Sequence, residues 1–220
     1  MKIGGNKTMK KLFIFDVDDV IYELKHIIRE ALTDATGKDI HPDKWFSFNL
    51  NEVYDVNIET IFNAFHKFDI LRNGTVNLEI YPVLEYLKKN NIETMAVTAR
   101  GWHSEGNEIT RRLFADNDIG INSIHVVQHH EKKSEVISKI EGFEIVGYID
   151  DNARHIQETK NVCGANIHNY FLKDQPWNQH YSVENEVGVH RIDKLASVPE
   201  QLDLILGQES KLSRKRNFKI

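Results

Sequence analysis

The sequence predicts an α/β protein with a doubly wound parallel sheet and a small helical cap inserted after the first strand. Residues 11–15 form a continuous apolar run, which is typical of a strand buried on both faces. From residue 92 onward, short apolar runs alternate with amphipathic segments, as they do in parallel sheets. Residues 23–80 show no such alternation, so we expect them to form an insert outside the sheet.

Length and composition are those of an ordinary globular protein. The chain has 220 residues, of which 40% are hydrophobic and 28% charged, and a formal net charge of −5 at pH 7. A negative net charge gives no reason to expect binding of duplex nucleic acid across the whole surface. No apolar run reaches the roughly 18 residues of a membrane span. The single cysteine, Cys163, fits a reducing compartment, so we expect a cytoplasmic protein without membrane contact.

A helix is expected directly after the first strand, from Asp19 or Val20. Apolar residues recur at helical spacing as far as Leu32, and Gly37 is a suitable stop. The later elements follow in order: helices at 58–71 and 81–91, a strand at 92–100, a helix at 104–117 with Ser104 as N-cap, a strand at 123–127, a helix at 133–142, a strand at 144–151, a helix at 153–161, a strand at 165–172 and a closing helix at 198–207.

The order of these elements divides the chain into four parts. We expect a disordered leader at residues 1–9, a core made of residues 10–22 and 81–206, a helical cap at 23–80 and a basic tail at 207–220. In a doubly wound sheet the ligand lies outside the carboxyl ends of the strands. The polar residues at those ends are therefore the candidates for function.

Carboxylates collect at two of these strand ends. Asp16 and Asp18 follow the first strand, and Asp150 and Asp151 end a later one. Any one of these acids has a simpler interpretation, as the N-cap of the helix that follows. Helix capping does not account for both clusters together. Crowded carboxylates repel one another unless a cation lies among them, and hard oxygen ligands favour Mg²⁺.

Four motifs in this order resemble those of the haloacid dehalogenase superfamily of phosphohydrolases, which has a Rossmann-like sheet. "FIFDVDDV" is similar to its first motif, "AVTAR" to the second, "KKSEVI" to the third and "GYIDDN" to the fourth. The resemblance covers residues 11 to about 155, and its first and fourth motifs are the specific ones. It implies a Mg²⁺-dependent phosphatase with a cap in the first of the superfamily's two cap positions.

The resemblance also implies roles for individual residues. Asp16 would be the nucleophile that forms an aspartyl-phosphate, and Asp18 the general acid and base. Phosphate would be bound by Thr98, Ala99 and Lys133; Lys133 is chosen over Lys132 because it stands immediately before a helical pattern. The metal ligands would be Asp16, the backbone carbonyl of Asp18, Asp150 and Asp151.

Asp19 and Arg100 depart from the usual motifs. Asp19 stands where the superfamily usually has glycine. The aspartate side chain either adds charge near the metal or points to solvent. Arg100 resembles an arginine of the polynucleotide 3′-phosphatase branch, so it is a candidate for binding a second phosphate or a nucleotide sugar-phosphate. The alternative for Arg100 is an ion pair with a nearby acid at the strand end.

Aromatic residues suggest a nucleotide substrate. In the expected cap, Trp45 and Phe46 lie in an irregular stretch where a ring can stack on a base, whereas most other cap aromatics form its core. The stretch "DQPWN", which includes Trp177, resembles the "DxPYN"-type segment of the 5′(3′)-deoxyribonucleotidase family. The alternative for Trp177 is simple packing beside a proline turn.

These observations favour a Mg²⁺-dependent nucleotidase that hydrolyses nucleoside monophosphates, with deoxyribonucleotides preferred. Two other phosphatases remain open: one for 3′-phosphorylated nucleic-acid ends and one for sugar phosphates or other small metabolites. A non-catalytic, phosphate-binding module similar to a receiver domain is the alternative outside enzymes. A receiver, however, places its acidic pair first and has no insert after the first strand. The sequence leaves the oligomeric state open.

Overall fold

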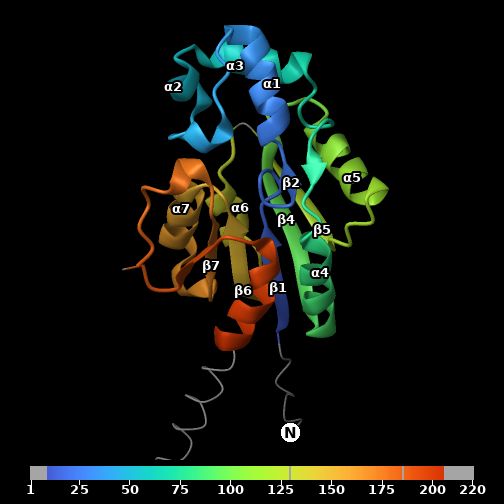
Figure 1. The fold of residues 1–220 in the computed structure, drawn as a ribbon. Coiled ribbons are helices and arrows are strands. Elements are labelled where there is room, and N and C mark those ends of the chain that lie inside the picture. Colours follow the sequence, from blue (N-terminus) through green and yellow to red (C-terminus); the bar gives the residue numbers. More distant parts are fainter. Residues whose placement is uncertain (1–8, 129, 185, 206–220) are drawn as a thin grey trace, which may run out of the picture.

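Six parallel strands form the central sheet of the computed structural model, which describes residues 9–128, 130–184 and 186–205 (Figure 1). The strand order is β5-β4-β1-β6-β7-β8, so β1 lies inside the sheet between β4 and β6. The strands are β1 (Lys10–Phe15), β4 (Ile92–Gly101), β5 (Ser123–Gln128), β6 (Phe143–Asp150), β7 (Tyr170–Lys173) and β8 (Val189–Ile192).

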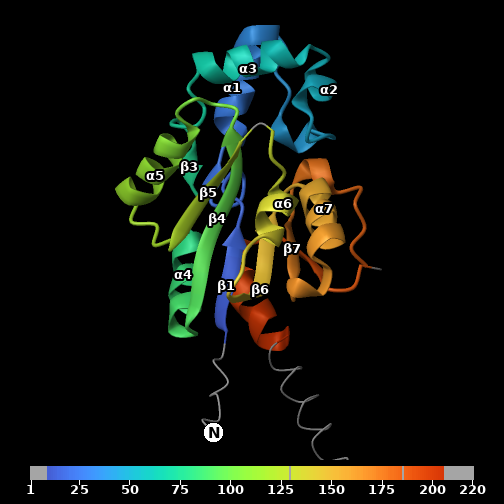
Figure 2. The ribbon, with the colours of Figure 1, turned by 180° about the vertical axis from the view of Figure 1, so that it is seen from behind.

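Both faces of the sheet are covered, as the apolar run in β1 requires. Phe13 and Phe15 belong to one buried cluster, while Leu12 and Ile14 belong to a second, because successive side chains of a strand point to opposite faces. The first cluster includes side chains of α4 (Ile80–Lys89), α5 (Gly106–Asp116) and the helix at 198–205. The second includes side chains of α6 (Lys133–Ser138) and α7 (Ala153–Cys163), which lie in front of the sheet in Figure 2.

Three helices stand beyond the carboxyl ends of the strands, at the top of Figure 1. They are α1 (Lys25–Thr36), α2 (Leu50–Tyr54) and α3 (Ile58–Lys67). A short antiparallel ribbon of β2 (Tyr22–Glu23) and β3 (Thr75–Val76) links them to the sheet. We call these helices and their connections the cap.

The start of the first helix differs from the prediction. Asp19 and Val20 lie in a tight turn, in which the backbone N–H groups of Val20, Ile21 and Tyr22 all donate to the carbonyl of Val17. The ribbon strand β2 follows, and α1 begins only at Lys25. Helical spacing of apolar residues was misleading here, because Ile21 and Tyr22 are buried by tertiary packing outside any helix.

Several other boundaries differ by a few residues. The helix expected from Ser104 begins at Gly106 with Glu105 as N-cap, and the strand expected at 165–172 is confined to Tyr170–Lys173. The helix expected at 133–142 ends at Ser138. The ribbon, α2 and β8 were not predicted. The expected leader, except Met9, and the basic tail lie outside the described residues.

Across the described residues, no helix has both the length and the apolar character needed to cross a bilayer. Cys163 is buried at the end of α7 and forms no disulfide.

Candidate active site

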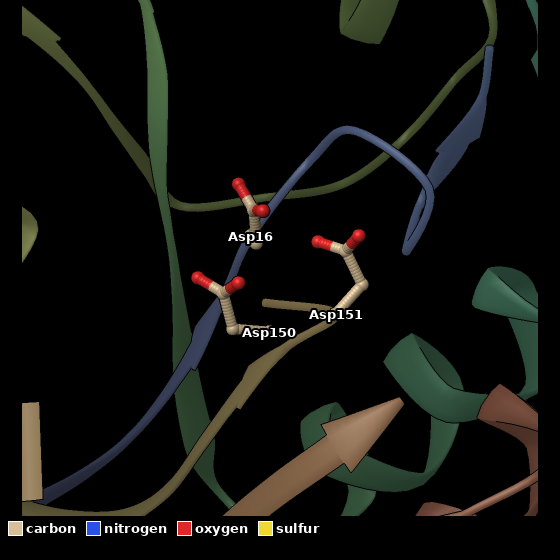
Figure 3. A group of neighbouring side chains, drawn as sticks. All are labelled: Asp16, Asp150 and Asp151. Carbon is tan, nitrogen blue, oxygen red and sulfur yellow. The ribbon is translucent and has the colours of Figure 1, made fainter. Parts of the chain in front are cut away.

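Three buried carboxylates meet where β1 and β6 end. Asp16 follows β1 directly, Asp150 is the last residue of β6, and Asp151 comes next. One oxygen from each lies within 4.8 Å of the others (Figure 3). The parallel pairing of β1 with β6, which joins Phe15 to Ile149, brings these strand ends to the same level.

Lys133, the first residue of α6, places an ammonium group among these carboxylates. Its Nζ lies 2.8 Å from Asp16 Oδ1 and 2.8 Å from Asp150 Oδ2, and the side chain is buried. Burial alone would lower the pKa of Lys133, but the charges of Asp150 and Asp16 outweigh this effect and raise it. The lysine is therefore held in its charged form.

The carboxylates differ in their electrostatic environment. The pKa of Asp16 is raised to about 6, mainly by burial; Lys133 opposes this rise, and nearby Asp150 and Asp18 add to it. Burial and the charge of Asp150 also raise the pKa of Asp151 well above its usual range. Burial is thus the main cause of both raised pKa values, and the neighbouring carboxylates add to it.

Asp150 is the best satisfied of the three. Burial would raise its pKa, but Lys133 and His155 lower it well below the usual range. Its carboxylate accepts hydrogen bonds from the Tyr148 hydroxyl and from the backbone N–H of Asn152, and His155 Nδ1 lies 3.3 Å from Oδ2. Asp150 is thus fixed in the ionised state.

This donor set fits a divalent cation. Three carboxylates and one ammonium leave a formal charge of −2 in a buried space, and all the ligand atoms are hard oxygens. Among the described residues, donors reach Asp16 Oδ1 and Asp151 Oδ2, the latter from the Trp177 indole at 3.0 Å. The other oxygen of Asp16 and the other oxygen of Asp151 are left for a metal ion.

Asp18 is not one of the three clustered carboxylates and pairs with Arg100. The Arg100 guanidinium donates from Nε to both Asp18 oxygens, at 3.0 and 3.1 Å, and from Nη2 to Oδ1 at 2.6 Å. Arg100 is 0% exposed, so the ion-pair alternative describes it and the expected phosphate contact does not. The side chain of Asp18 keeps 29% exposure and lines the cavity described below.

Asp19 occupies the glycine position of the motif in a backbone conformation that glycine favours. Its φ is +54°, in the left-handed region that aspartate tolerates better than most residues. Its buried carboxylate accepts a hydrogen bond from the Leu24 N–H at 3.0 Å, next to the start of α1. Burial raises the pKa of Asp19 to about 7, despite this hydrogen bond.

Thr98 and Ala99 lie on β4, next to β1 in the sheet. The hydroxyl of Thr98 is buried and has no hydrogen-bond partner among the described residues. A buried unpaired hydroxyl is uncommon in proteins and calls for a partner of some kind. Ala99 is exposed and lines the cavity.

A cavity of about 320 Å³ extends from the carboxylates into the cap. Asp16, Asp18 and Lys133 line its sheet end. Its other end is lined by apolar and aromatic side chains of the cap and of the loop after β4, which include Ile58, Ile61, Phe62, Phe65 and Trp102. We call this apolar end the cap lobe.

A second cavity, of about 410 Å³, is more polar and shares part of the same wall. Phe48, Ala99, Lys133 and His155 line both cavities, while Lys132 and Arg154 line only the polar one. Lys133 and His155, which lie 2.8 and 3.3 Å from Asp150, are therefore shared by an apolar and a polar space.

The predicted aromatic residues differ in whether they line a cavity. Trp45 and Trp177 line the apolar cavity, and their rings lie 6.1 Å apart between cap and core. Phe46 is 63% exposed and lines neither of these cavities, so the prediction that it contacts substrate is not supported. Its neighbour Phe48 lines both and contacts the Trp177 and His155 rings.

Sequence reasoning missed His155, Tyr148 and Trp102. His155 lies in the first turn of α7, directly after the acidic pair, and this spacing was the one available signal. Tyr148 lies two residues before Asp150 on the same strand, hence on the same face. Trp102 reaches the cap only through tertiary packing, against Phe62 at 5.3 Å and Phe65 at 5.9 Å.

Comparison with protein-family models finds no match, and comparison with curated proteins finds none either. Solved structures do match. A haloacid dehalogenase-like family hydrolase from Xanthomonas campestris is 14% identical, with a TM-score of 0.58 over 92% of this chain and 99% of that one. A protein described as a predicted phosphatase from Clostridium acetobutylicum is 11% identical, with a TM-score of 0.61 over 89% and 99%.

A third match is a haloacid dehalogenase superfamily hydrolase of subfamily IA from Geobacter sulfurreducens. It is 11% identical, with a TM-score of 0.56 over 91% of this chain and 100% of that one. The matches span nearly the whole of each protein, cap included. At these identities they establish the architecture, and the chain has the fold of haloacid dehalogenase superfamily hydrolases.

Proposed function

We propose that the chain is a Mg²⁺-dependent phosphomonoesterase that hydrolyses nucleoside monophosphates through an aspartyl-phosphate. The convergence of Asp16, Asp150, Asp151 and Lys133 at one sheet edge carries this proposal. Phosphoryl transfer needs a nucleophile, positive charge around the phosphoryl oxygens and a proton donor for the leaving group. The site contains a candidate for each role, and solved hydrolases and phosphatases share the fold.

Asp16 is the proposed nucleophile. Its Oδ1 is held by the Val17 N–H at 2.7 Å and by Lys133 at 2.8 Å, so the carboxylate has a fixed orientation at the end of β1. Attack of one carboxylate oxygen on phosphorus forms the Asp16–phosphoryl bond and breaks the bond to the substrate alcohol. Lys133 lies where it would neutralise charge on both the carboxylate and the phosphoryl group.

Asp18 is the proposed general acid and base. In its protonated form it gives a proton to the departing alkoxide, and it then accepts one from the water that attacks phosphorus. That attack breaks the Asp16–phosphoryl bond and releases inorganic phosphate. Asp18 lines the same cavity as Asp16, which supports this assignment.

The other assignments follow the same logic. Asp16, Asp150 and Asp151 would hold Mg²⁺, together with the backbone carbonyl of Asp18, and the ion would supply charge stabilisation for the phosphoryl oxygens. The unpaired hydroxyl of Thr98 and the exposed edge of Ala99 would contact those oxygens.

The cap lobe supports a nucleoside as the leaving group. Its lining is rich in aromatic rings, including Trp45, Phe62 and Trp102, and such rings stack on bases. A sugar phosphate is more polar and would leave this surface unused. Lys133 is the one cationic side chain among the lining residues, and it is already paired with carboxylates, so the lobe favours a single phosphate and an uncharged leaving group.

The alternatives have less support. Arg100, on which the comparison with polynucleotide 3′-phosphatases rested, is buried against Asp18. A receiver-like binding module has no need for an apolar cavity next to its acidic cluster. Deoxyribose against ribose, and 5′- against 3′-phosphate, are questions that the substrate panel below addresses.

The test is phosphate release from a panel of 5′- and 3′-nucleoside monophosphates, a 3′-phosphorylated oligonucleotide and several sugar phosphates, with Mg²⁺ and with chelator. We expect turnover with Mg²⁺ only, and the highest kcat/KM for a mononucleotide. Preference for the oligonucleotide or for a sugar phosphate would replace the proposed substrate. No release from any compound by folded, Mg²⁺-bound protein would contradict the proposed phosphatase.

A further inference from the structure

We propose that Arg100 is a positioning residue that holds the Asp18 carboxylate in its working orientation. This inference rests on the proposed function, in which Asp18 transfers the protons. The pairing uses two guanidinium nitrogens, Nε and Nη2, at distances of 2.6 to 3.1 Å from Asp18. Hydrogen bonds from two nitrogens to one carboxylate fix the plane of the carboxylate as well as its position.

Arg100 is itself held from several sides. Its Nη1 donates to the Thr110 hydroxyl on α5 at 3.3 Å, and this hydroxyl donates to the Gly106 carbonyl at 2.6 Å. The guanidinium carbon lies 5.4 Å from the centre of the Tyr22 ring on the ribbon, a cation–π distance. The guanidinium is thus fixed by the core helix α5 and by the link to the cap.

Backbone packing also depends on a close approach at this point. A Cβ atom added to Gly106 would lie 2.1 Å from the Arg100 carbonyl oxygen, so only glycine lets α5 begin against this strand. α5 therefore starts close enough for its Thr110 to reach Nη1. The arrangement around Arg100 is built from the first turns of α5, the end of β4 and β2.

The location of the pair explains why Asp18 needs such support. Asp18 follows the strand end by three residues and lies in the tight turn that begins at Val17. Its carboxylate is not part of the metal cluster, whose ligand atoms come from Asp16, Asp150 and Asp151. Arg100 and the cavity are its neighbours, so the arginine decides how the carboxylate faces the leaving group.

The sharpest test uses leaving groups of different acidity. A nucleoside monophosphate loses a weakly acidic alcohol and needs the general acid, whereas p-nitrophenyl phosphate loses a stable phenolate and does not. Because kcat/KM reports steps up to the first irreversible one, it measures how much the departure of the leaving group depends on the general acid. We expect Arg100→Gln to lower kcat/KM for the nucleotide about 10²-fold or more, and for p-nitrophenyl phosphate less than about tenfold.

The second proton transfer gives a further readout. With p-nitrophenyl phosphate, Arg100→Gln should release one equivalent of nitrophenol quickly and then turn over slowly, because Asp18 no longer assists water. Asp18→Asn should show the same pattern. In the Asp18→Asn background, Arg100→Gln should cost little more, since residues that act as a unit are not additive.

Arg112→Lys on exposed α5 and Leu113→Ala in its buried face are the controls. Arg112 pairs with Glu108 in solvent, and Leu113 packs in the core, so the second variant lowers stability without touching Asp18. Neither should change the ratio of kcat/KM between the two substrates. If Arg100→Gln does not fold, Thr110→Val leaves the guanidinium in place and removes the hydroxyl that contacts Nη1 and the Gly106 carbonyl. It should change this ratio roughly three- to tenfold.

Failure of the positioning role can be distinguished from failure of the proposed function. Equal losses for both substrates, or full additivity with Asp18→Asn, would overturn the positioning role and leave a structural one. Unchanged kcat/KM for both substrates in a folded Arg100→Gln protein would also overturn it. Absence of phosphate release by the wild-type protein from either compound would instead count against the proposed function.

Discussion

The carboxylate edge of the sheet and the cap lobe line the same cavity but are built in different ways. The edge consists of strand ends whose charged groups are buried and paired, as in the contact of Lys133 with Asp16 and Asp150. The cap lobe consists of apolar rings such as Phe62 and Trp102, which contact one another across cap and core. In the proposed function, the charged edge carries out the chemistry and the apolar lobe selects the leaving group.

The largest expected effect is at the charged edge. Asp16→Asn keeps the shape of the side chain but removes the nucleophile, so phosphate release should fall about 10⁴-fold or more for every substrate. The measurement is kcat/KM for the nucleotide and for p-nitrophenyl phosphate.

Asp43→Asn is the matched control for this variant, because Asp43 is an exposed cap residue and its loss should leave activity unchanged. If Asp16→Asn lost activity toward only one class of substrate, the charged edge would not have the proposed role in catalysis for all substrates.

At the charged edge, the raised pKa of Asp19 predicts that the stability of the fold depends on pH. In metal-free protein its pKa is about 7, above the usual 3.8, so the folded state binds the proton more tightly than the unfolded one. Stability therefore falls as pH rises from about 4 to about 7, and the loss is complete above pH 7. In chelator, Asp19→Asn should gain on the order of 3 kcal/mol at pH 8 and nothing at pH 4.

Urea unfolding at the two pH values measures this gain. Asparagine tolerates the left-handed backbone and keeps an acceptor for the Leu24 N–H. Asp55→Asn, at φ +52° on the exposed surface, is the control and should change little at either pH. An equal gain at pH 4 would show that charge burial is not the cause.

Metal binding should stabilise the same edge. Mg²⁺ at about 100 times its Kd should add about 2.7 kcal/mol to the free energy of unfolding, which corresponds to a rise in Tm of about 5 to 10 °C. Asp151→Asn removes one anionic ligand but keeps an acceptor for the Trp177 indole, so the rise should shrink or vanish. Differential scanning fluorimetry with and without Mg²⁺ measures it, and an undiminished rise in this variant would exclude Asp151 as a ligand.

The smallest effect is expected in the cap, where two neighbouring phenylalanines provide a matched pair. Phe48 lines both cavities, whereas the more exposed Phe46 lines neither. Loss of one stacking ring should raise KM for nucleoside monophosphates roughly 5- to 30-fold in Phe48→Ala, with kcat nearly unchanged. Phe46→Ala should behave as wild type, and an effect in Phe46→Ala alone would mean that the substrate takes another path.

The two regions also differ in how far the sequence predicts them. The acidic strand ends were predictable, because an apolar run ending in aspartates has a local signature and parallel strands bring their ends together. An ion pair of Arg100 with a nearby acid was one of two open alternatives, but the sequence did not identify Asp18 as that acid, since 82 residues separate the partners. The ribbon and β8 were missed because two to four residues carry too little periodicity to stand out.

The cap shows the same limit. Its aromatic residues were visible in the sequence, but Phe46 and Phe48 lie two residues apart in one short irregular stretch. Only the fold shows that Phe48 lines the cavity and that the more exposed Phe46 does not. Helical spacing predicted the start of α3 at Ile58, but the helix ends at Lys67 and not at the predicted residue 71. The same spacing misplaced the start of α1, since burial of Ile21 and Tyr22 arises from tertiary contacts.

The most direct test of the central claim is to trap the phosphoryl group on the enzyme. Asp18→Asn protein mixed with Mg²⁺ and p-nitrophenyl phosphate, quenched in acid and digested, should carry one phosphoryl group on the peptide that contains Asp16. Asp16→Asn protein treated in the same way should carry none. Phosphatase activity in the wild type, with the phosphoryl group on another residue or on none, would contradict the account of the carboxylate edge.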